Sequence, residues 1–227
     1  MTTARPAFLA HLDHSLLAPN STWSELEDAA RVALELEVAA LCIIPSFVAR
    51  ATELVAGSRV AVCTVIGFPH GTTTTAAKLA ETRDVLALGA REIDVVVNPS
   101  DVLSNRWEQV HSEMKAITSL VHDEGALVKW IFETCLLDDA KKQRLCEIAS
   151  EVGVDWVKTS TGFGAHGATA HDVKLLRSHV PDSIQVKASG GIRTLAEVES
   201  YLALGASRIG TSRSSSLLAE WSARSVD

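Results

Sequence analysis

Short apolar runs of strand length recur eight times along this chain of 227 residues, and an amphipathic helical pattern follows most of them. We expect strands at Ala7–Leu12, Ala39–Ile44, Val60–Ile66, Glu92–Val97, Leu127–Phe132, Trp156–Thr159, Ile184–Ala188 and Arg208–Gly210. The helical patterns cover Glu25–Leu36, Ala76–Leu88, Val110–His122, Ala140–Val152, Val173–His179 and Leu195–Leu204. Eight such alternations favour an α/β fold, a closed (β/α)8 TIM barrel, with a doubly wound open sheet as the alternative.

One domain over residues 1–227 is the simplest organisation, because the composition does not break anywhere along the chain and no low-complexity linker interrupts it. Signals for helix N-termini support the assignment of strands and helices given above. Thr22, Thr169 and Thr194 each precede a carboxylate by three residues, as an N-cap hydroxyl does. Residues past about 219 have no strong pattern, and we expect this C-terminal tail to fray.

Charge and composition exclude several classes of partner. The net charge is −7 and no long basic run occurs, so we expect no nucleic-acid partner. No apolar run approaches about 18 residues, and the N-terminus lacks an apolar signal core, which predicts a cytoplasmic protein without a membrane partner. Four cysteines without a CxxC pair indicate free thiols in a reducing compartment. The oligomeric state stays open, and a homo-oligomer is compatible with the sequence.

Two lysines mark the ends of neighbouring predicted strands. Lys158 and Lys187 each close a strand-like run and are followed by a small, hydroxyl-rich turn that contains glycine. Burial at the rim of a strand disfavours the ammonium form of lysine, and a second ammonium nearby acts in the same direction. A neutral amine is a nucleophile, so this pair favours an enzyme that uses an amine nucleophile over a passive scaffold.

Strand alternation predicts which side chains meet on the barrel axis. Lys158, Lys187, Asp94 and Lys129 fall on the inward faces of their strands. A buried ion-pair network is the structural explanation for any single Lys–Asp pair. A cluster of several such charges favours a functional site, because their combined desolvation is costly. Whether Lys129 tunes the site or only pairs with Asp94 stays open.

The turns after the last three strands predict a phosphate site. Thr159–Gly162, Ala188–Gly191 and Ile209–Ser212 combine glycine with hydroxyl groups at strand-to-helix junctions. Their backbone amides can bind anionic oxygens, and the loops after strands seven and eight often hold phosphate in these barrels. Arg193 and Arg213 are nearby cations that can contribute.

Five segments together resemble the deoxyribose-phosphate aldolase family, and they run in order from about residue 9 to 213. They are His11–Leu17 (HLDHSLL), Ile66–Gly71 (IGFPHG), Glu92–Asn98 (EIDVVVN), Val157–Gly162 (VKTSTG) and Lys187–Arg193 (KASGGIR). The resemblance implies a class I, Schiff-base aldolase of carbohydrate catabolism. Such an enzyme reversibly cleaves 2-deoxy-D-ribose 5-phosphate to acetaldehyde and D-glyceraldehyde 3-phosphate without metal or organic cofactor.

The resemblance also implies residue roles. Lys158 is then the Schiff-base lysine, Lys187 is the neighbouring cation that perturbs its ionisation and relays protons, and Asp94 is the proton-transfer carboxylate acting with a water. Asp13, expected at the end of strand one, supports this network. The phosphate-binding positions are Gly162, Gly190, Gly191, Gly210 and Ser212.

Two positions depart from the family pattern. Some members have a tyrosine near the C-terminus that assists proton transfer, whereas the single tyrosine here, Tyr201, lies in a helical run. Some relatives have a phosphate-binding lysine where Phe163 stands. The alternatives are therefore a Schiff-base aldolase for another small aldehyde or keto-sugar phosphate, and a non-catalytic sugar-phosphate binding barrel. A metal site is not expected, because neither His11 with His14 nor His166 with His171 has a third ligand.

Overall fold

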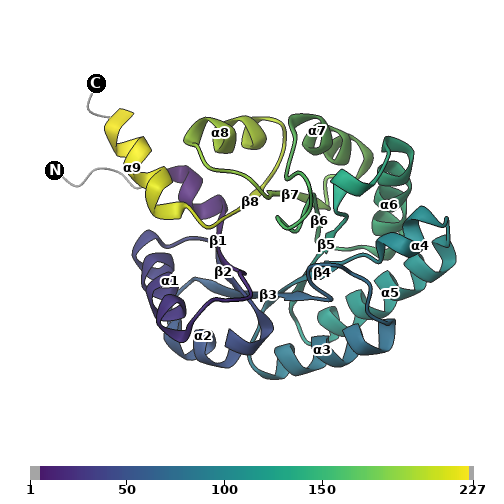
Figure 1. Ribbon diagram of the computed structural model, residues 1–227, viewed down its shortest axis with the longest axis horizontal. Helices are drawn as coiled ribbons and strands as arrows, with labels where there is room; N and C mark the ends of the chain where they lie inside the picture. Colours follow the sequence, from purple (N-terminus) through teal and green to yellow (C-terminus); the bar gives the residue numbers. More distant parts are fainter. Residues whose placement is uncertain (1–5, 225–227) are drawn as a thin grey trace.

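The computed structural model describes residues 6–224 and shows a closed barrel of eight parallel strands in chain order (Figure 1). The strands are β1 (Leu12–Leu16), β2 (Ala40–Ile43), β3 (Ala61–Ile66), β4 (Glu92–Val96), β5 (Leu127–Ile131), β6 (Trp156–Lys158), β7 (Gln185–Ser189) and β8 (Arg208–Thr211). β8 pairs with β1, which closes the ring. The expected single-domain (β/α)8 barrel is confirmed, and the open-sheet alternative is wrong.

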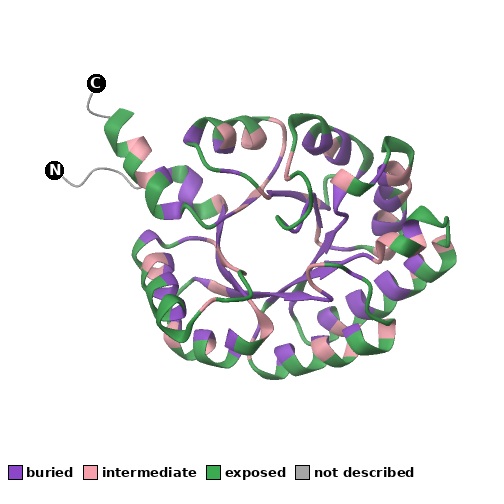
Figure 2. Ribbon diagram, viewed as in Figure 1, coloured by how far each residue is buried: buried purple, intermediate pink, exposed green. Residues whose placement is uncertain are grey.

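Helices surround the barrel and direct their buried faces toward the strands (Figures 1 and 2). They are α1 (Trp23–Leu36), α2 (Val48–Leu54), α3 (Thr75–Ala87), α4 (Pro99–Leu103), α5 (Trp107–Asp123), α6 (Asp139–Val152), α7 (Ala170–His179), α8 (Leu195–Ala203) and α9 (Ser214–Arg224), with 3-10 turns η1 (Ala7–His11), η2 (Pro45–Phe47) and η3 (Thr134–Leu136). The three threonine N-caps are confirmed: each hydroxyl accepts the backbone N–H three residues on. Within residues 6–224, no helix is long and apolar enough to cross a membrane.

The first strand was placed wrongly. Ala7–His11 forms η1, and β1 begins only at Leu12. The apolar residues Phe8 and Leu9 are buried in the outer core rather than in the sheet. Strand β1 contains Asp13, a charged residue that interrupts the apolar pattern expected of a strand because its side chain is buried inside the barrel. The sequence pattern did not indicate helix α9, which continues past residue 219 to Arg224, so the expected fraying is wrong for residues 219–224. The same expectation for residues 225–227 lies outside the described part of the chain.

Two different environments fill the space around the strands. Between strands and helices lies an apolar core to which outward-facing residues such as Trp130 and Val186 belong. Inside the barrel, β2 and β3 contribute a small apolar cluster of Ala40, Cys42, Cys63 and Val65. The inward positions of the other strands carry charged groups. The barrel interior is thus apolar on one side and ionic on the other, and the ionic side holds the site described next.

Candidate active site

Asp94 on β4 is the centre of a buried charge cluster. Lys158 and Lys187 both donate to its Oδ2 atom at 2.7 Å, and Lys129 donates to Oδ1 at 2.8 Å. All four side chains are at most 2% exposed. The pairing of Asp94 with Lys129 and of Lys158 with Lys187 in the strand register explains why they meet. The inward orientation expected from strand alternation is confirmed.

A second group of charges lies around the first. Asp13 accepts hydrogen bonds from Lys187 and, at 2.6 Å, from Arg208. Glu92 pairs with Lys129 at 2.6 Å and with Arg208 at 2.8 Å. Asp13 is therefore the second residue of β1 and part of the buried network, not a residue at the strand end as expected. Lys129 pairs with Asp94 and also with Glu92.

Sequence reasoning missed Arg208 as a member of the cluster. It begins β8 on the same face as Gly210, so strand alternation alone points it inward. Its guanidinium lies over the ring of Trp156, with 5.1 Å from Cζ to the ring centroid, and the Nζ atom of Lys129 lies 5.8 Å from that centroid. These contacts are within the range of cation–π interactions. Trp156, Arg208, Lys129 and Glu92 thus form a filled layer next to Asp13 and Asp94.

The cluster carries one more positive than negative group. Three carboxylates (Asp13, Glu92, Asp94) face four cations (Lys129, Lys158, Lys187, Arg208). Burial alone raises the pKa of Asp94, but the surrounding lysines outweigh it and hold this pKa well below its usual value. Burial likewise disfavours the Lys187 ammonium, but Asp13 and Asp94 outweigh it and raise the pKa of Lys187. Loss of one proton therefore leaves the cluster electrically balanced.

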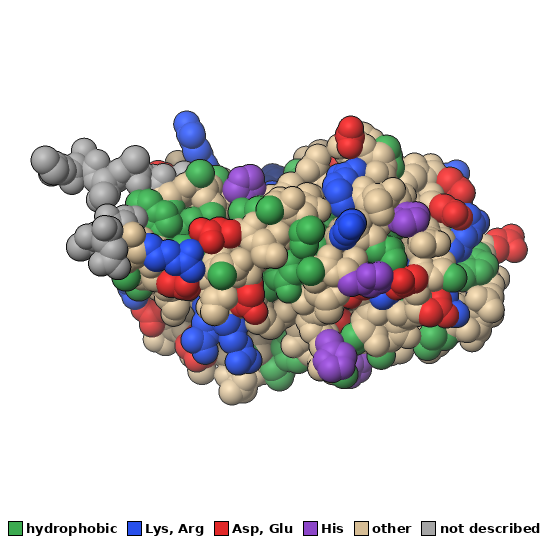
Figure 3. All heavy atoms as spheres, turned by 90° about the horizontal axis from the view of Figure 1, so that it is seen from above, with side chains coloured by type: hydrophobic (Ala, Val, Ile, Leu, Met, Phe, Trp, Pro, Cys, Tyr) green, Lys and Arg blue, Asp and Glu red, His purple; other side chains and the backbone are tan. Residues whose placement is uncertain are grey.

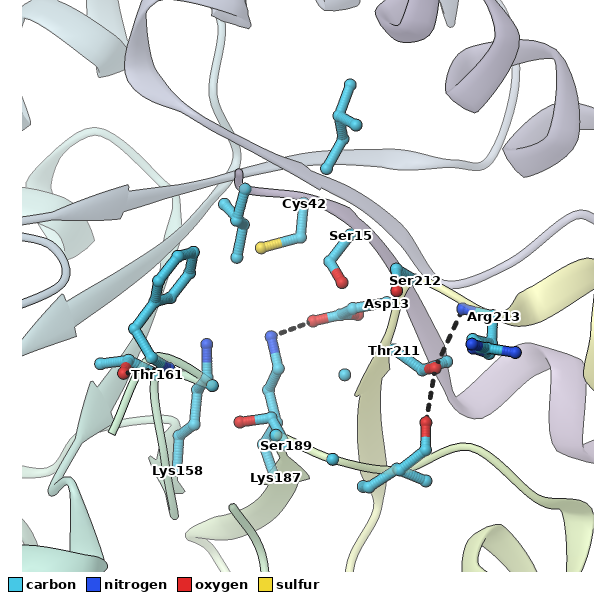
Figure 4. A pocket seen from close by; sticks show the side chains of 18 of the residues that line it. Asp13, Ser15, Cys42, Lys158, Thr161, Lys187, Ser189, Thr211, Ser212 and Arg213 are labelled. Atoms are coloured by element: carbon cyan, nitrogen blue, oxygen red, sulfur yellow. Dashed lines mark hydrogen bonds and ion pairs between the residues drawn. The ribbon is translucent and has the colours of Figure 1, made fainter. Parts of the chain in front are cut away.

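A cavity of about 390 Å³ opens above the two lysines at the carboxyl ends of the strands. Figure 4 shows Lys158 and Lys187 side by side, with their amines directed into this space toward Asp13, Ser15 and Cys42. All of the phosphate-binding candidates line it, and so do the two expected cations: Gly162, Gly190, Gly191, Gly210, Ser212, Arg193 and Arg213. Asp94 is not among the lining residues, and its contact with the cavity is indirect, through its hydrogen bonds to Lys158 and Lys187.

The glycine turns leave backbone donors unused. Gly162, Gly190 and Gly191 have φ values of 89°, 87° and 76°, a left-handed conformation that favours glycine. Their amides donate to no acceptor among residues 6–224. The first two turns touch, since a Cβ atom on Gly190 would lie 3.2 Å from the Cα atom of Gly162. This arrangement can bind an anion.

Gly210 has a different task. A Cβ atom there would lie 2.9 Å from the Cβ atom of Ser189 and 3.3 Å from the Cε atom of Lys187. The absence of a side chain at this position gives Lys187 room to reach Asp13 and Asp94.

Three residues singled out earlier have defined places. Phe163 is 49% exposed, lines the cavity and packs edge-on against Phe68 at 5.4 Å between ring centroids. Tyr201 donates to the carbonyl of Ala168 at 2.8 Å. Cys42 both is buried and lines the cavity.

Metal-ligand geometry within the described residues is confined to three donor sets. Two of them lie in the barrel. One consists of Asp94 with Cys42 and Cys63, and the other consists of Asp13 and Glu92 with Cys63. The third set, Asp139 with His171 and Asp172, lies outside the barrel. In every set the carboxylates are already paired with lysine ammonium groups, including Lys142 in the third. A dication at these positions would compete with a lysine ammonium group for the same carboxylates.

Comparison with known proteins agrees with this geometry. Residues 8–223 match the model of the DeoC/LacD family aldolases. Deoxyribose-phosphate aldolase from Rhodopirellula baltica is 48% identical over 209 residues, which are 92% of this chain and 87% of that protein. The enzyme of the same name from Clostridioides difficile is 41% identical over 204 residues, 90% of this chain and 92% of that protein.

Solved structures show the same likeness. A putative deoxyribose-phosphate aldolase from Coccidioides immitis superposes with a TM-score of 0.90 at 33% identity, covering 94% of this chain and 85% of that one. Tetrameric deoxyribose phosphate aldolase from Aeropyrum pernix gives a TM-score of 0.89 at 33% identity, covering 96% and 92%. On the family match and the identities of these relatives, the chain belongs to the DeoC/LacD family of aldolases.

Proposed function

We propose that this protein reversibly cleaves 2-deoxy-D-ribose 5-phosphate to acetaldehyde and D-glyceraldehyde 3-phosphate through a Schiff base on Lys158. One observation carries the proposal. Two lysines share a single oxygen atom of a buried aspartate, at the edge of a cavity that is lined by unused glycine amides. The named activity of the relatives supports the same reaction.

Lys158 is the proposed nucleophile because it lines the cavity and pairs with Asp94 alone among the described carboxylates, whereas Lys187 pairs with both Asp13 and Asp94. Without the proton of Lys158, the site holds three carboxylates and three remaining cations, Lys129, Lys187 and Arg208. The free amine then adds to the C1 aldehyde of the open-chain sugar, and loss of water gives an iminium ion. The iminium restores the positive charge next to Asp94, so the cluster stabilises it as it stabilised the ammonium.

The C2–C3 bond then breaks. A base removes the proton of the C3 hydroxyl, the C3 oxygen becomes the aldehyde of glyceraldehyde 3-phosphate, and the bonding electrons move into the iminium to form an enamine. Protonation of the enamine at carbon and hydrolysis release acetaldehyde and free Lys158. We propose that Asp94, Lys187 and a water molecule transfer these protons, with Asp13 holding Lys187 in place. Asp94 starts as an anion and Lys187 as a cation, which suits them to accept and to donate a proton respectively.

Phosphate recognition is proposed for the glycine turns that line the cavity. The amides of Gly162, Gly190 and Gly191 are available as donors, and Gly210 and Ser212 lie on the same wall. Arg193 and Arg213 add positive charge at the rim. Amides with one or two cations are a sufficient phosphate site, so Phe163 in place of a lysine does not remove this recognition.

Borohydride trapping tests the proposal. Reduction in the presence of substrate should attach a fragment to Lys158 that peptide mass spectrometry locates, and Lys158→Leu should remove both the adduct and the cleavage activity. An adduct elsewhere, or full activity in the leucine variant, contradicts the assignment. Lys174→Leu, a substitution on the exposed side of α7, is the matched control and should leave trapping unchanged.

A second substrate class follows from the half-exposed ring of Phe163. The same chemistry on an aldehyde or keto-sugar without phosphate needs no charge at this rim. Comparison of kcat/KM between 2-deoxyribose 5-phosphate and unphosphorylated 2-deoxyribose separates the two, and a higher value for the unphosphorylated sugar favours the second class. Saturable binding of the sugar phosphate without turnover indicates a non-catalytic binding barrel.

Assembly and location complete the proposal. The Aeropyrum pernix relative is a tetramer, and we propose a homo-oligomer here, which light scattering on the purified protein tests. The visible face in Figure 3 mixes positive and negative side chains without a continuous basic strip, which fits a small-molecule substrate rather than nucleic acid. A cytoplasmic location and a role in sugar-phosphate breakdown stay predictions.

A further inference from the structure

Glu133 is a buried carboxylate that the proposed reaction does not use. It follows β5, is 5% exposed and, within residues 6–224, accepts hydrogen bonds from Thr161 and the thiol of Cys135 but forms no ion pair with a lysine, arginine or histidine. The barrel cluster neutralises its carboxylates with cations, and this one lacks that compensation. A buried carboxylate held by neutral donors costs stability, so its position calls for an explanation.

The backbone at Glu133 is also strained. Its φ and ψ angles are 53° and 63°, in the left-handed region, which is unfavourable for a residue other than glycine. The neighbouring amides enforce it: Phe132 N–H donates to the carbonyl of Lys158 at 3.0 Å, and Thr134 N–H donates to that of Thr159 at 2.9 Å. Between these two anchors the chain turns, and Glu133 faces the turn that follows Lys158.

In that turn Glu133 accepts both donors of Thr161, its N–H and its hydroxyl. The Thr161 N–H lies 3.4 Å from both carboxylate oxygens, and the Thr161 hydroxyl donates to Oε2 in a short hydrogen bond. The same hydroxyl accepts the N–H of Phe163 at 3.1 Å. Of these three consecutive amides, Gly162 alone has no protein acceptor among the described residues, and Gly162 lines the cavity beside the Gly190 turn.

The space around the carboxylate is fitted to it. At residue 164, a Cβ atom would lie 3.2 Å from Cδ of Glu133 and 2.8 Å from Sγ of Cys135, so Gly164 leaves room for the acid. The carboxylate also borders a second hollow of about 210 Å³ on the far side of the Thr161 turn. Glu133 therefore contacts the Thr161 turn on the side of this second hollow, and the larger cavity lies on the opposite side of the turn.

We propose that Glu133 is a positioning residue for phosphate recognition. By binding the Thr161 N–H and hydroxyl, it fixes the turn after Lys158 so that the Gly162 N–H points at the substrate phosphate. The inference rests on the proposed function, because the phosphate is that of the sugar substrate. It assigns to Glu133 the binding of the phosphorylated end and no part in carbon–carbon cleavage.

The test compares phosphorylated and unphosphorylated substrate in three variants. Glu133→Ala should raise KM for 2-deoxyribose 5-phosphate about tenfold, the equivalent of about 1.4 kcal/mol, with kcat within about twofold of the wild type. The value of kcat/KM for 2-deoxyribose should change less than about twofold. Inorganic phosphate, used as a competitive inhibitor, should bind about tenfold more weakly.

Two conservative variants distinguish the effect of the length of the Glu133 side chain from the effect of its charge. Glu133→Gln keeps an oxygen at the same distance and should restore most of the phosphate preference. Glu133→Asp keeps the charge but falls one methylene short and should behave like alanine. If the alanine variant does not fold, the glutamine and aspartate variants decide the question.

The control and the contrary outcomes are distinct. Glu113→Gln changes another buried carboxylate, paired with Lys78 outside the barrel, and should leave the phosphate preference unchanged. An equal loss on both sugars, or no change in KM for the phosphorylated one, overturns the role of Glu133. The absence of a borohydride adduct in the wild type overturns the proposed function instead.

Discussion

Lys187→Leu removes one ammonium group from the charge cluster and should slow cleavage strongly while the barrel stays folded. Lys158 and Lys187 each lie 2.7 Å from the same carboxylate oxygen. With ordinary hydrogen-bond angles this places the two nitrogens about 4.5 Å apart. At an effective dielectric constant of about 20, two such charges repel by about 3 to 4 kcal/mol, which corresponds to about 2 to 3 pH units.

The expected result follows from the charge count. Without Lys187, three carboxylates face three cations, so the formation of a neutral amine no longer leaves the cluster balanced. The pH profile of kcat/KM should therefore shift upward by about 2 to 3 units, and activity at pH 7 should fall at least about a hundredfold. Asp13 keeps Arg208 as a partner, which preserves the fold.

The assay is the rate of acetaldehyde release between pH 6 and 10, with thermal unfolding as the measure of folding. Lys142→Leu is the matched control, since it removes a buried lysine that pairs with Asp172 between α6 and α7, away from the site. It should lower stability and leave the pH profile unchanged. A rate near that of the wild type for Lys187→Leu, with an unshifted profile, refutes the coupling of the two lysines.

Three further substitutions test other parts of the structure. Gly210→Ala places a methyl group against Ser189 and Lys187 and should lower kcat more than tenfold; an unaffected kcat contradicts the steric argument. Lys78→Met leaves Glu113 buried without its partner and should cost about 3 to 5 kcal/mol of unfolding free energy by denaturant titration, whereas a loss below about 1 kcal/mol argues against the pair. Burial lowers the pKa of His14 to about 4, so folding stability should decrease as pH falls from about 6.5 toward 4, because the unfolded chain binds the proton more readily. This part of the acid sensitivity should disappear in His14→Gln, and an identical pH dependence in both proteins excludes it.

Strand periodicity was sufficient to predict the centre of the site. Asp94, Lys158 and Lys187 sit on strands whose outward residues are apolar, so the two-residue alternation defines their direction, and parallel pairing then brings them together. The same reasoning failed at β1, because Asp13 and its polar neighbours interrupt the apolar pattern where the strand contributes to the site. The apolar segment just before it resembled a strand more closely.

The role inferred for Glu133 had no local signal. Its left-handed backbone follows from amides that bond to the next strand, and its partner Thr161 lies 28 residues away. The same is true of Arg208, whose partners Asp13 and Glu92 lie on other strands. Such contacts depend on strand register around the closed ring, which the amino-acid pattern of any single segment does not specify.

The layer of Trp156, Arg208, Lys129 and Glu92 should restrict the exchange of protons with solvent to one end of the barrel. Because these side chains pack next to the two buried aspartates, we expect the hydrogen that reaches the methyl group of acetaldehyde to enter from the cavity side. We expect the departing glyceraldehyde 3-phosphate to leave by the same opening. In heavy water, solvent deuterium should then reach the enamine carbon mainly after that product has left, so added glyceraldehyde 3-phosphate should suppress isotope incorporation as well as net cleavage.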